Sequence, residues 1–193
     1  MASQDGDRPS VFLNLPYDDG FAARCLAYIA AVSSFGLIPH VVVGTQGNTR
    51  LSRIVDLIGK CQYSIHDLSR TKRFNMPFEL GFTMGYHWSN PTHKWLVFAP
   101  ERNWVDKSLT DIKGIDIYAH HGTIAGIMCE IGNSFVNRIR QPSVSEMMRI
   151  YRTLRSAVPE IQRKTGSKTL FTASFFSEIS ATAAALAEKY IAR

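Results

Sequence analysis

The chain has 193 residues, a formal net charge of +6, and a composition of 45% hydrophobic and 20% charged residues. This composition is typical of a folded globular protein with one ordinary domain, and it excludes an intrinsically disordered chain. The longest apolar runs fall far short of the roughly 20 residues that span a bilayer, and the first ten residues lack the apolar segment of a secretory signal. We therefore expect a cytoplasmic protein without membrane association.

The positive charge does not predict a nucleic-acid partner. The basic excess is spread over residues 50–73 and 138–168, and no RNP, zinc-finger or homeodomain pattern accompanies it. A solvated basic surface explains the charge, and an anionic small molecule such as a nucleotide is the functional alternative. The three widely spaced cysteines form neither a disulfide framework nor a metal-binding pair, and we expect Cys25, Cys61 and Cys129 to be core residues.

Short apolar runs alternate with amphipathic segments along the first two thirds of the chain. After a flexible start at residues 1–9, the pattern predicts strands at 10–15, 38–44, 63–68, 94–100 and 114–120. Helices are predicted at 21–36, at 49–60, and from residue 76 or 77 to about 88, where Pro77 suits a first helical turn. The face predicted to be apolar in the second of these helices carries Leu51, Ile54, Val55 and Ile58.

Continuous apolar strands that alternate with helices are typical of a parallel sheet covered on both faces. The sequence therefore predicts an α/β fold over residues 10–142: a doubly wound, mostly parallel sheet of about five strands. Two further helices, at 143–165 with a kink or break at Pro159 and at 175–192, form a C-terminal helical extension over residues 143–193. We expect this extension to pack on the α/β domain or to serve as a surface for a homo-oligomer or a partner protein.

Polar residues follow the predicted strands at the edge where open α/β sheets bind ligands. Those that could bind a substrate are Asn14 and Tyr17 after the first strand, Asp67 and Ser69 after the third, and Arg73, Asn75 and Met76 in the next loop. Arg70, Lys72 and Arg73 form a basic cluster that is either a solvated loop or a phosphate clamp. No GxGxxG or GxxxxGK[ST] motif is present.

Glu79 lies in the aromatic-rich segment RFNMPFELG. In the first turn of a helix, a carboxylate can simply complement the helix dipole or cap free N–H groups. Alternatively, Phe74, Phe78, Phe82 and Pro77 would screen it from water, and a partly desolvated carboxylate suits nucleophilic or electrostatic catalysis at a sugar carbon.

Three short segments, VFLNLPYDD, HDLSR and FELG, resemble the nucleoside 2-deoxyribosyltransferases and equally the TIR-type NAD-cleaving domains, over roughly residues 10–121. This resemblance implies a flavodoxin-like fold in which Glu79 performs the chemistry at the ribose C1′. It also implies that Asp67 holds the substrate and that Asn14 and Tyr17 lie near the base. The sequence departs from both patterns before Glu79, where it reads RFNMPF.

The resemblance therefore predicts a hydrolase or transferase for the N-glycosidic bond of a nucleoside or nucleotide such as NAD, without a cofactor or metal. Its setting would be nucleotide metabolism or bacterial defence or signalling. The alternative is a non-catalytic nucleotide-sensing or protein-interaction domain of the same fold. We interpret His66 as structural, and the His120-His121 pair lacks the convergent ligands that a metal site needs.

Overall fold

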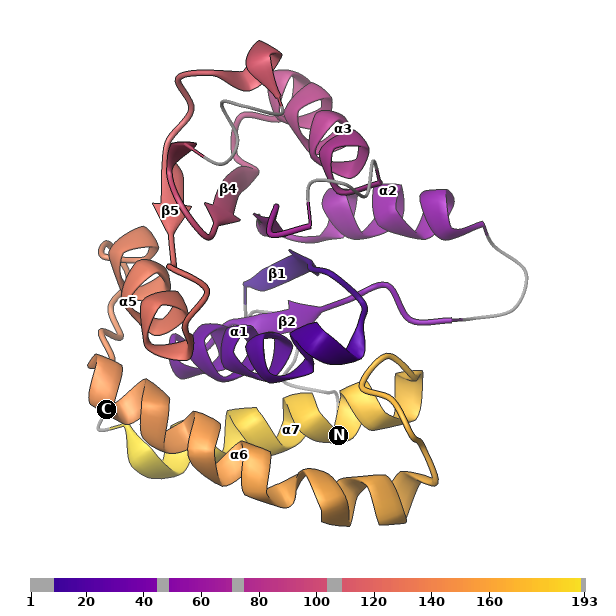
Figure 1. Cartoon of the computed structure of the whole chain (residues 1–193), viewed down its shortest axis with the longest axis vertical. Helices are drawn as coiled ribbons and strands as arrows, with labels where there is room; N and C mark the ends of the chain where they lie inside the picture. The colour runs from indigo at the N-terminus through magenta and orange to yellow at the C-terminus, as the bar shows by residue number, and fades with distance from the viewer. Residues whose placement is uncertain (1–8, 45–48, 71–74, 104–108, 192–193) are drawn as a thin grey trace, which may run out of the picture.

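The computed structural model describes residues 9–44, 49–70, 75–103 and 109–191. A five-stranded, all-parallel sheet has the order β2-β1-β3-β4-β5, which is the flavodoxin-like arrangement (Figure 1). The strands are β1 (Ser10–Asn14), β2 (Ile38–His40), β3 (Tyr63–Asp67), β4 (Lys94–Ala99) and β5 (Ile117–Ala119). The helices are α1 (Ala22–Ser34), α2 (Arg50–Lys60), α3 (Asn75–Ser89), α5 (Ile124–Ser134), α6 (Val144–Thr165) and α7 (Ala173–Tyr190).

Both faces of the sheet carry buried apolar side chains, as a doubly wound fold requires. Successive residues of β1 point to opposite faces: Val11 and Leu13 pack into the core with α1 and α5, whereas Phe12 packs with Ile54 and Ile58 of α2. In Figure 1, α2 and α3 cover one face, and α1 and α5 cover the other. The predicted α/β fold is confirmed.

The C-terminal helices α6 and α7 form a further layer outside α1 (Figure 1). Every residue of α1 from Cys25 to Ser34 is buried, because the sheet lies on one side of this helix and α6 and α7 lie on the other. A helix that is hydrophobic all round has to be enclosed in this way. The side chains of α6 and α7 join the same continuous core as the α1 side of the sheet.

Several element predictions need correction. The strand predicted at 38–44 is shorter, and the three valines after His40 lie outside it. Helix α5 was missed, although Thr123 caps it by accepting a hydrogen bond from Gly126 N–H. Helix α6 runs unbroken through Pro159, because Leu154 and Ile161 on either side of it pack into the core.

Exposure corrects two further predictions. On α2, Ile54 and Ile58 are buried, whereas Leu51 and Val55 are 40% and 46% exposed. Cys25 and Cys61 are buried core residues as predicted, but Cys129 is exposed on α5.

None of the helices in the described ranges is long and apolar enough to cross a membrane.

The strand at one edge of the sheet, β2, has only three residues and has Pro39 at its centre. It pairs with β1 in parallel register, with Pro39 opposite Val11, and Ile38 N–H donates to the carbonyl of Pro9.

Candidate functional site

The ends of β1 and β3 lie side by side at the point where the strand order of the sheet reverses. Asn14, the last residue of β1, is paired with His66 of β3, and Asp67 ends β3. In open α/β sheets this switch point, at the carboxyl ends of the strands, is where ligands bind. The predicted residues divide here into two groups, one around Glu79 and one around Asp67.

Glu79 is buried at this edge, with only 3% of its surface exposed. Its Oε1 lies 3.4 Å from a guanidinium nitrogen of Arg50, and its Oε2 accepts no hydrogen bond of ordinary geometry from any described residue. Burial raises the pKa of Glu79, while Arg50 and the nearby Asn14 amide lower it. A buried carboxylate oxygen without a partner is costly, so this atom calls for an explanation.

The cause of this burial differs from the one predicted. Helix α3 begins at Asn75, so Glu79 lies beyond its first turn, where the helix dipole has little effect. Phe78 and Phe82 do not screen the carboxylate, because they are 59% and 37% exposed. They line a cavity of about 520 Å³ between α2 and α3 instead. Phe74 lies outside the described residues.

Arg50 is the functional candidate that sequence reasoning missed. Its guanidinium lies 4.8 Å from the centre of the Tyr17 ring and also pairs with Glu79, while its side chain stays 41% exposed. Arg50 therefore covers Glu79 on the solvent side. The available signal was its position: it opens the helix after the second strand, at the same edge of the sheet as Asn14.

Tyr17 is held beneath Arg50 by the protein itself. Its hydroxyl accepts a hydrogen bond from Val42 N–H at 3.2 Å, and its ring packs edge-on against Phe171 at 4.6 Å. Burial raises the pKa of the Tyr17 hydroxyl, so it stays protonated at neutral pH. Tyr17, Asn14 and Glu79, which were predicted to act together, thus lie near one another and near Arg50.

Asn14 is completely buried and contacts His66 through its side chain. Its Nδ2 lies 3.0 Å from His66 Nδ1, while its Oδ1, like Glu79 Oε2, has no hydrogen-bond partner among the described residues. Burial lowers the pKa of His66 to about 3, so its imidazole is neutral under ordinary conditions. Glu79 and Asn14 together contribute two buried oxygen atoms that the described protein leaves unpaired.

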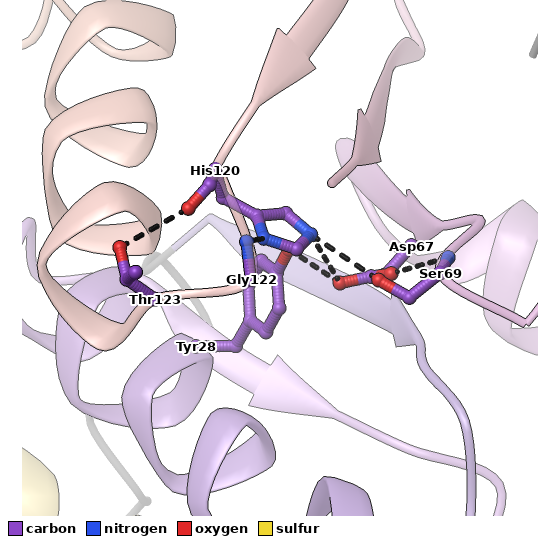
Figure 2. Close-up of polar contacts among 6 residues, drawn as sticks. All are labelled: Tyr28, Asp67, Ser69, His120, Gly122 and Thr123. Atoms are coloured by element: carbon purple, nitrogen blue, oxygen red, sulfur yellow. Dashed lines mark hydrogen bonds and ion pairs between the residues drawn. The ribbon is translucent and has the colours of Figure 1, made fainter. Parts of the chain in front are cut away.

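In the group around Asp67, both carboxylate oxygens have partners within the protein, and we refer to it as the closed group. Asp67 Oδ2 accepts a hydrogen bond from the Tyr28 hydroxyl at 2.8 Å and lies 3.3 Å from His120 Nε2, while Oδ1 accepts from Ser69 N–H at 2.8 Å. Figure 2 shows the Tyr28 hydroxyl from α1, the Ser69 backbone N–H after β3 and the His120 ring after β5 converging on the carboxylate. Asp67 and His120 are fully buried, so this carboxylate is bonded within the protein rather than directed at a ligand.

His120 does not act as a general base in this group. Its Nδ1 accepts a hydrogen bond from Gly122 N–H, so the neutral ring carries its proton on Nε2. That same Nε2 faces both Asp67 Oδ2 and Ser69 Oγ, each at 3.3 Å, and has no free lone pair for the serine proton. Ser69, His120 and Asp67 therefore form a structural network rather than a nucleophilic triad.

Of the other predicted residues, Met76 and Asn75 have no polar contact with either group among the described residues. Met76 is buried in an apolar cluster with Leu68 and Leu80, Asn75 is exposed, and Arg73 and Lys72 lie outside the described residues. Arg70 pairs with Asp18 at 3.4 Å. In the described ranges, no cluster of three or more His, Cys, Asp or Glu side chains could hold a metal ion.

Comparisons with protein-family models, curated proteins and solved structures find no match for this chain.

Proposed function

We propose that this protein is an enzyme that acts on the N-glycosidic bond of a nucleoside or nucleotide, with Glu79 as its reactive carboxylate. The observation that carries the proposal is Glu79 Oε2, a buried oxygen at the ligand-binding edge without a hydrogen-bond partner among the described residues. Protein interiors rarely leave such an atom unpaired, and active sites are a common exception.

The chemistry follows from the charge of the carboxylate. As the bond between the ribose C1′ and the base nitrogen breaks, its electron pair leaves with the base and positive charge develops at C1′. The ionised Glu79 stabilises this charge or attacks C1′ to form a glycosyl ester. Water then completes hydrolysis, or a second base completes transfer. Arg50 favours the ionised form of Glu79 and offers a guanidinium to an anionic substrate such as NAD.

Incubation of the purified protein with NAD and with a panel of deoxynucleosides, followed by chromatography of the released base, tests the proposal. Nicotinamide release would indicate a TIR-like activity, and base release or exchange would indicate a deoxyribosyltransferase-like activity. Glu79→Gln should abolish turnover, whereas Glu160→Gln, an exposed change on α6, should leave it intact. Turnover that survives in Glu79→Gln would refute the catalytic assignment.

A second candidate function is a non-catalytic domain that senses a nucleotide or binds a partner protein. The observation in its favour is that Arg50 and the surrounding packing leave Glu79 only 3% exposed, which restricts access to the carboxylate. On this reading NAD or a deoxynucleoside binds, as measured by calorimetry, but no base is released at any protein concentration.

A further inference from the structure

A chain of hydrogen bonds leads from a backbone carbonyl to Asn14 through three buried side chains. The carbonyl of Cys61 lies 2.8 Å from His93 Nδ1, and His93 Nε2 lies 3.0 Å from Ser64 Oγ. Ser64 Oγ in turn lies 3.2 Å from His66 Nε2, and His66 Nδ1 lies 3.0 Å from Asn14 Nδ2. Ser64, His66 and Asn14 are completely inaccessible to solvent, and His93 is 3% exposed.

The direction of every bond in this chain follows from its first member. A carbonyl oxygen only accepts, so His93 carries its proton on Nδ1, and Nε2 of the neutral ring must accept. Ser64 therefore donates its hydroxyl proton to His93, and its oxygen is left to accept from His66 Nε2.

The same reasoning extends to Asn14. With its proton on Nε2, the neutral His66 ring has an accepting Nδ1, which only an N–H group can satisfy. The Asn14 amide must accordingly turn its Nδ2 toward His66, which leaves Oδ1 as an acceptor without a partner among the described residues. The reversed amide would place two acceptors against each other at His66. Burial keeps both rings neutral, because it lowers the pKa of His66 and of His93.

We propose that His66, Ser64 and His93 are positioning residues that lock the Asn14 amide so that Oδ1 accepts a hydrogen bond from the ligand. The site then selects a ligand that presents an O–H or N–H donor at this point, and it disfavours one that presents an acceptor, because two acceptors would meet in a buried place. The identity of the ligand as a nucleoside or nucleotide rests on the proposed function, whereas the orientation of the amide does not.

Long-range nitrogen–proton NMR spectra of the ¹⁵N-labelled protein test the orientation directly, because protonated and unprotonated imidazole nitrogens differ in chemical shift. We expect opposite tautomers, with His66 protonated on Nε2 and His93 protonated on Nδ1. A His66 ring that is protonated on Nδ1, or that is an imidazolium near neutral pH, would overturn the proposal. This measurement needs neither a substrate nor a variant.

Ser64→Ala breaks the chain at its centre, and Ser34→Ala is its matched control. Ser34 is equally buried, but among the described residues its hydroxyl donates a hydrogen bond to the Ala31 carbonyl within α1 and to no other group. In Ser64→Ala we expect the His66 tautomer to become mixed and KM for the substrate that turns over to rise about tenfold, with kcat changing much less. In Ser34→Ala the His66 tautomer and KM should both stay as in the wild type.

An unchanged His66 tautomer together with an unchanged KM in Ser64→Ala would overturn the proposed relay, by which we mean the hydrogen-bonded chain His93–Ser64–His66 that orients the Asn14 amide.

The experiments distinguish failure of the relay from failure of the proposed function. If the wild type releases no base but shows the expected tautomers, the proposed function fails and the relay stands. If base is released but His66 shows the opposite tautomer, the relay fails and the proposed function stands.

Discussion

The two polar groups at the carboxyl edge of the sheet are built from similar residues but differ in how completely they are paired. Around Asp67, three donors from different parts of the chain converge on one carboxylate. Around Glu79, the carboxylate has a long contact to a half-exposed arginine and lies near the Asn14 amide, and Glu79 Oε2 and Asn14 Oδ1 have no described hydrogen-bond partner. A fully paired buried network stabilises the fold, whereas an incompletely paired one costs stability and is retained where it serves a ligand.

The largest loss of stability should come from a change at Gly126, a residue that does not itself bond to Asp67 but packs against the backbone of His120. A Cβ atom at this position would lie 2.0 Å from the carbonyl oxygen of His120, so Gly126→Ala forces the end of β5 away from Asp67. We expect a loss of about 3 kcal/mol in the free energy of unfolding, measured by urea denaturation. Gly132→Ala in the same helix is the control: its Cβ would meet only Met147, at 3.8 Å. Equal stability of the two variants would contradict the close approach.

Asp67→Asn should be the next most damaging change. The variant has one acceptor oxygen and an NH₂ group in place of the two carboxylate oxygens, so at least one buried donor loses its partner. We expect a loss of about 2 kcal/mol in the free energy of unfolding. Tyr28→Phe, which removes a single donor, should cost about 1 kcal/mol. A variant of normal stability that no longer binds nucleotide would instead support the sequence prediction that Asp67 holds the substrate.

Glu79→Gln should change stability in the opposite direction. Because the folded-state pKa of Glu79 is raised, its ionisation destabilises the folded protein as pH rises through and above the usual carboxyl range. The neutral amide avoids this cost, so we expect the variant to gain about 1 kcal/mol near neutral pH. Thermal unfolding across a pH series should show the gain shrinking as pH falls through the raised folded-state pKa of Glu79 and vanishing below the unfolded-state pKa. A loss of stability at neutral pH would place Glu79 among the structural carboxylates.

Arg50→Gln should have the smallest effect on stability, because the Arg50 side chain is 41% exposed, and its effect should appear in the pH profile of turnover. Arg50 lowers the pKa of Glu79, so its removal raises that pKa further. Turnover that needs the ionised carboxylate would then be lost at a higher pH as the solution is acidified, and the acid limb of kcat/KM should move upward. Arg163→Gln on α6, where Arg163 pairs with Glu160, should leave the profile unchanged. An acid limb that does not move would show that Glu79 does not control it.

Local patterns were sufficient to predict the fold because both faces of the sheet are covered. The β-strand at 10–14 contains a continuous apolar run and ends in a polar residue, and the strands at 10–14 and 63–67 are both buried beyond their first residue. Helix α5 was missed because its segment, IAGIMCEIGNS, contains two glycines and little polar contrast. The strand predicted through the three valines ended early because hydrogen bonding to β1 stops at His40, and β propensity alone does not determine pairing.

The site was harder to predict because its properties depend on contacts between distant residues. The sequence correctly suggested that Glu79 is desolvated. It predicted that Phe78 and Phe82 shield the carboxylate from water, whereas both side chains are exposed. Arg50 lies 29 residues before Glu79, and no local spacing connects them. The sequence favoured a structural role for His66, because a strand directs His66 and Asp67 to opposite faces. The contact of His66 with Asn14 depends on the pairing of β1 with β3, whereas Ser64 lies two residues before His66 in the same strand.

The proline in the edge strand β2 has a consequence for how copies of this chain can meet. Since Ile38 directs its N–H group toward β1, the alternation of a parallel strand directs the backbone of Pro39 toward the open edge, where proline has no N–H to donate. Within β2, an incoming strand would find no amide donor. The edge is thereby protected against strand-by-strand growth into aggregates.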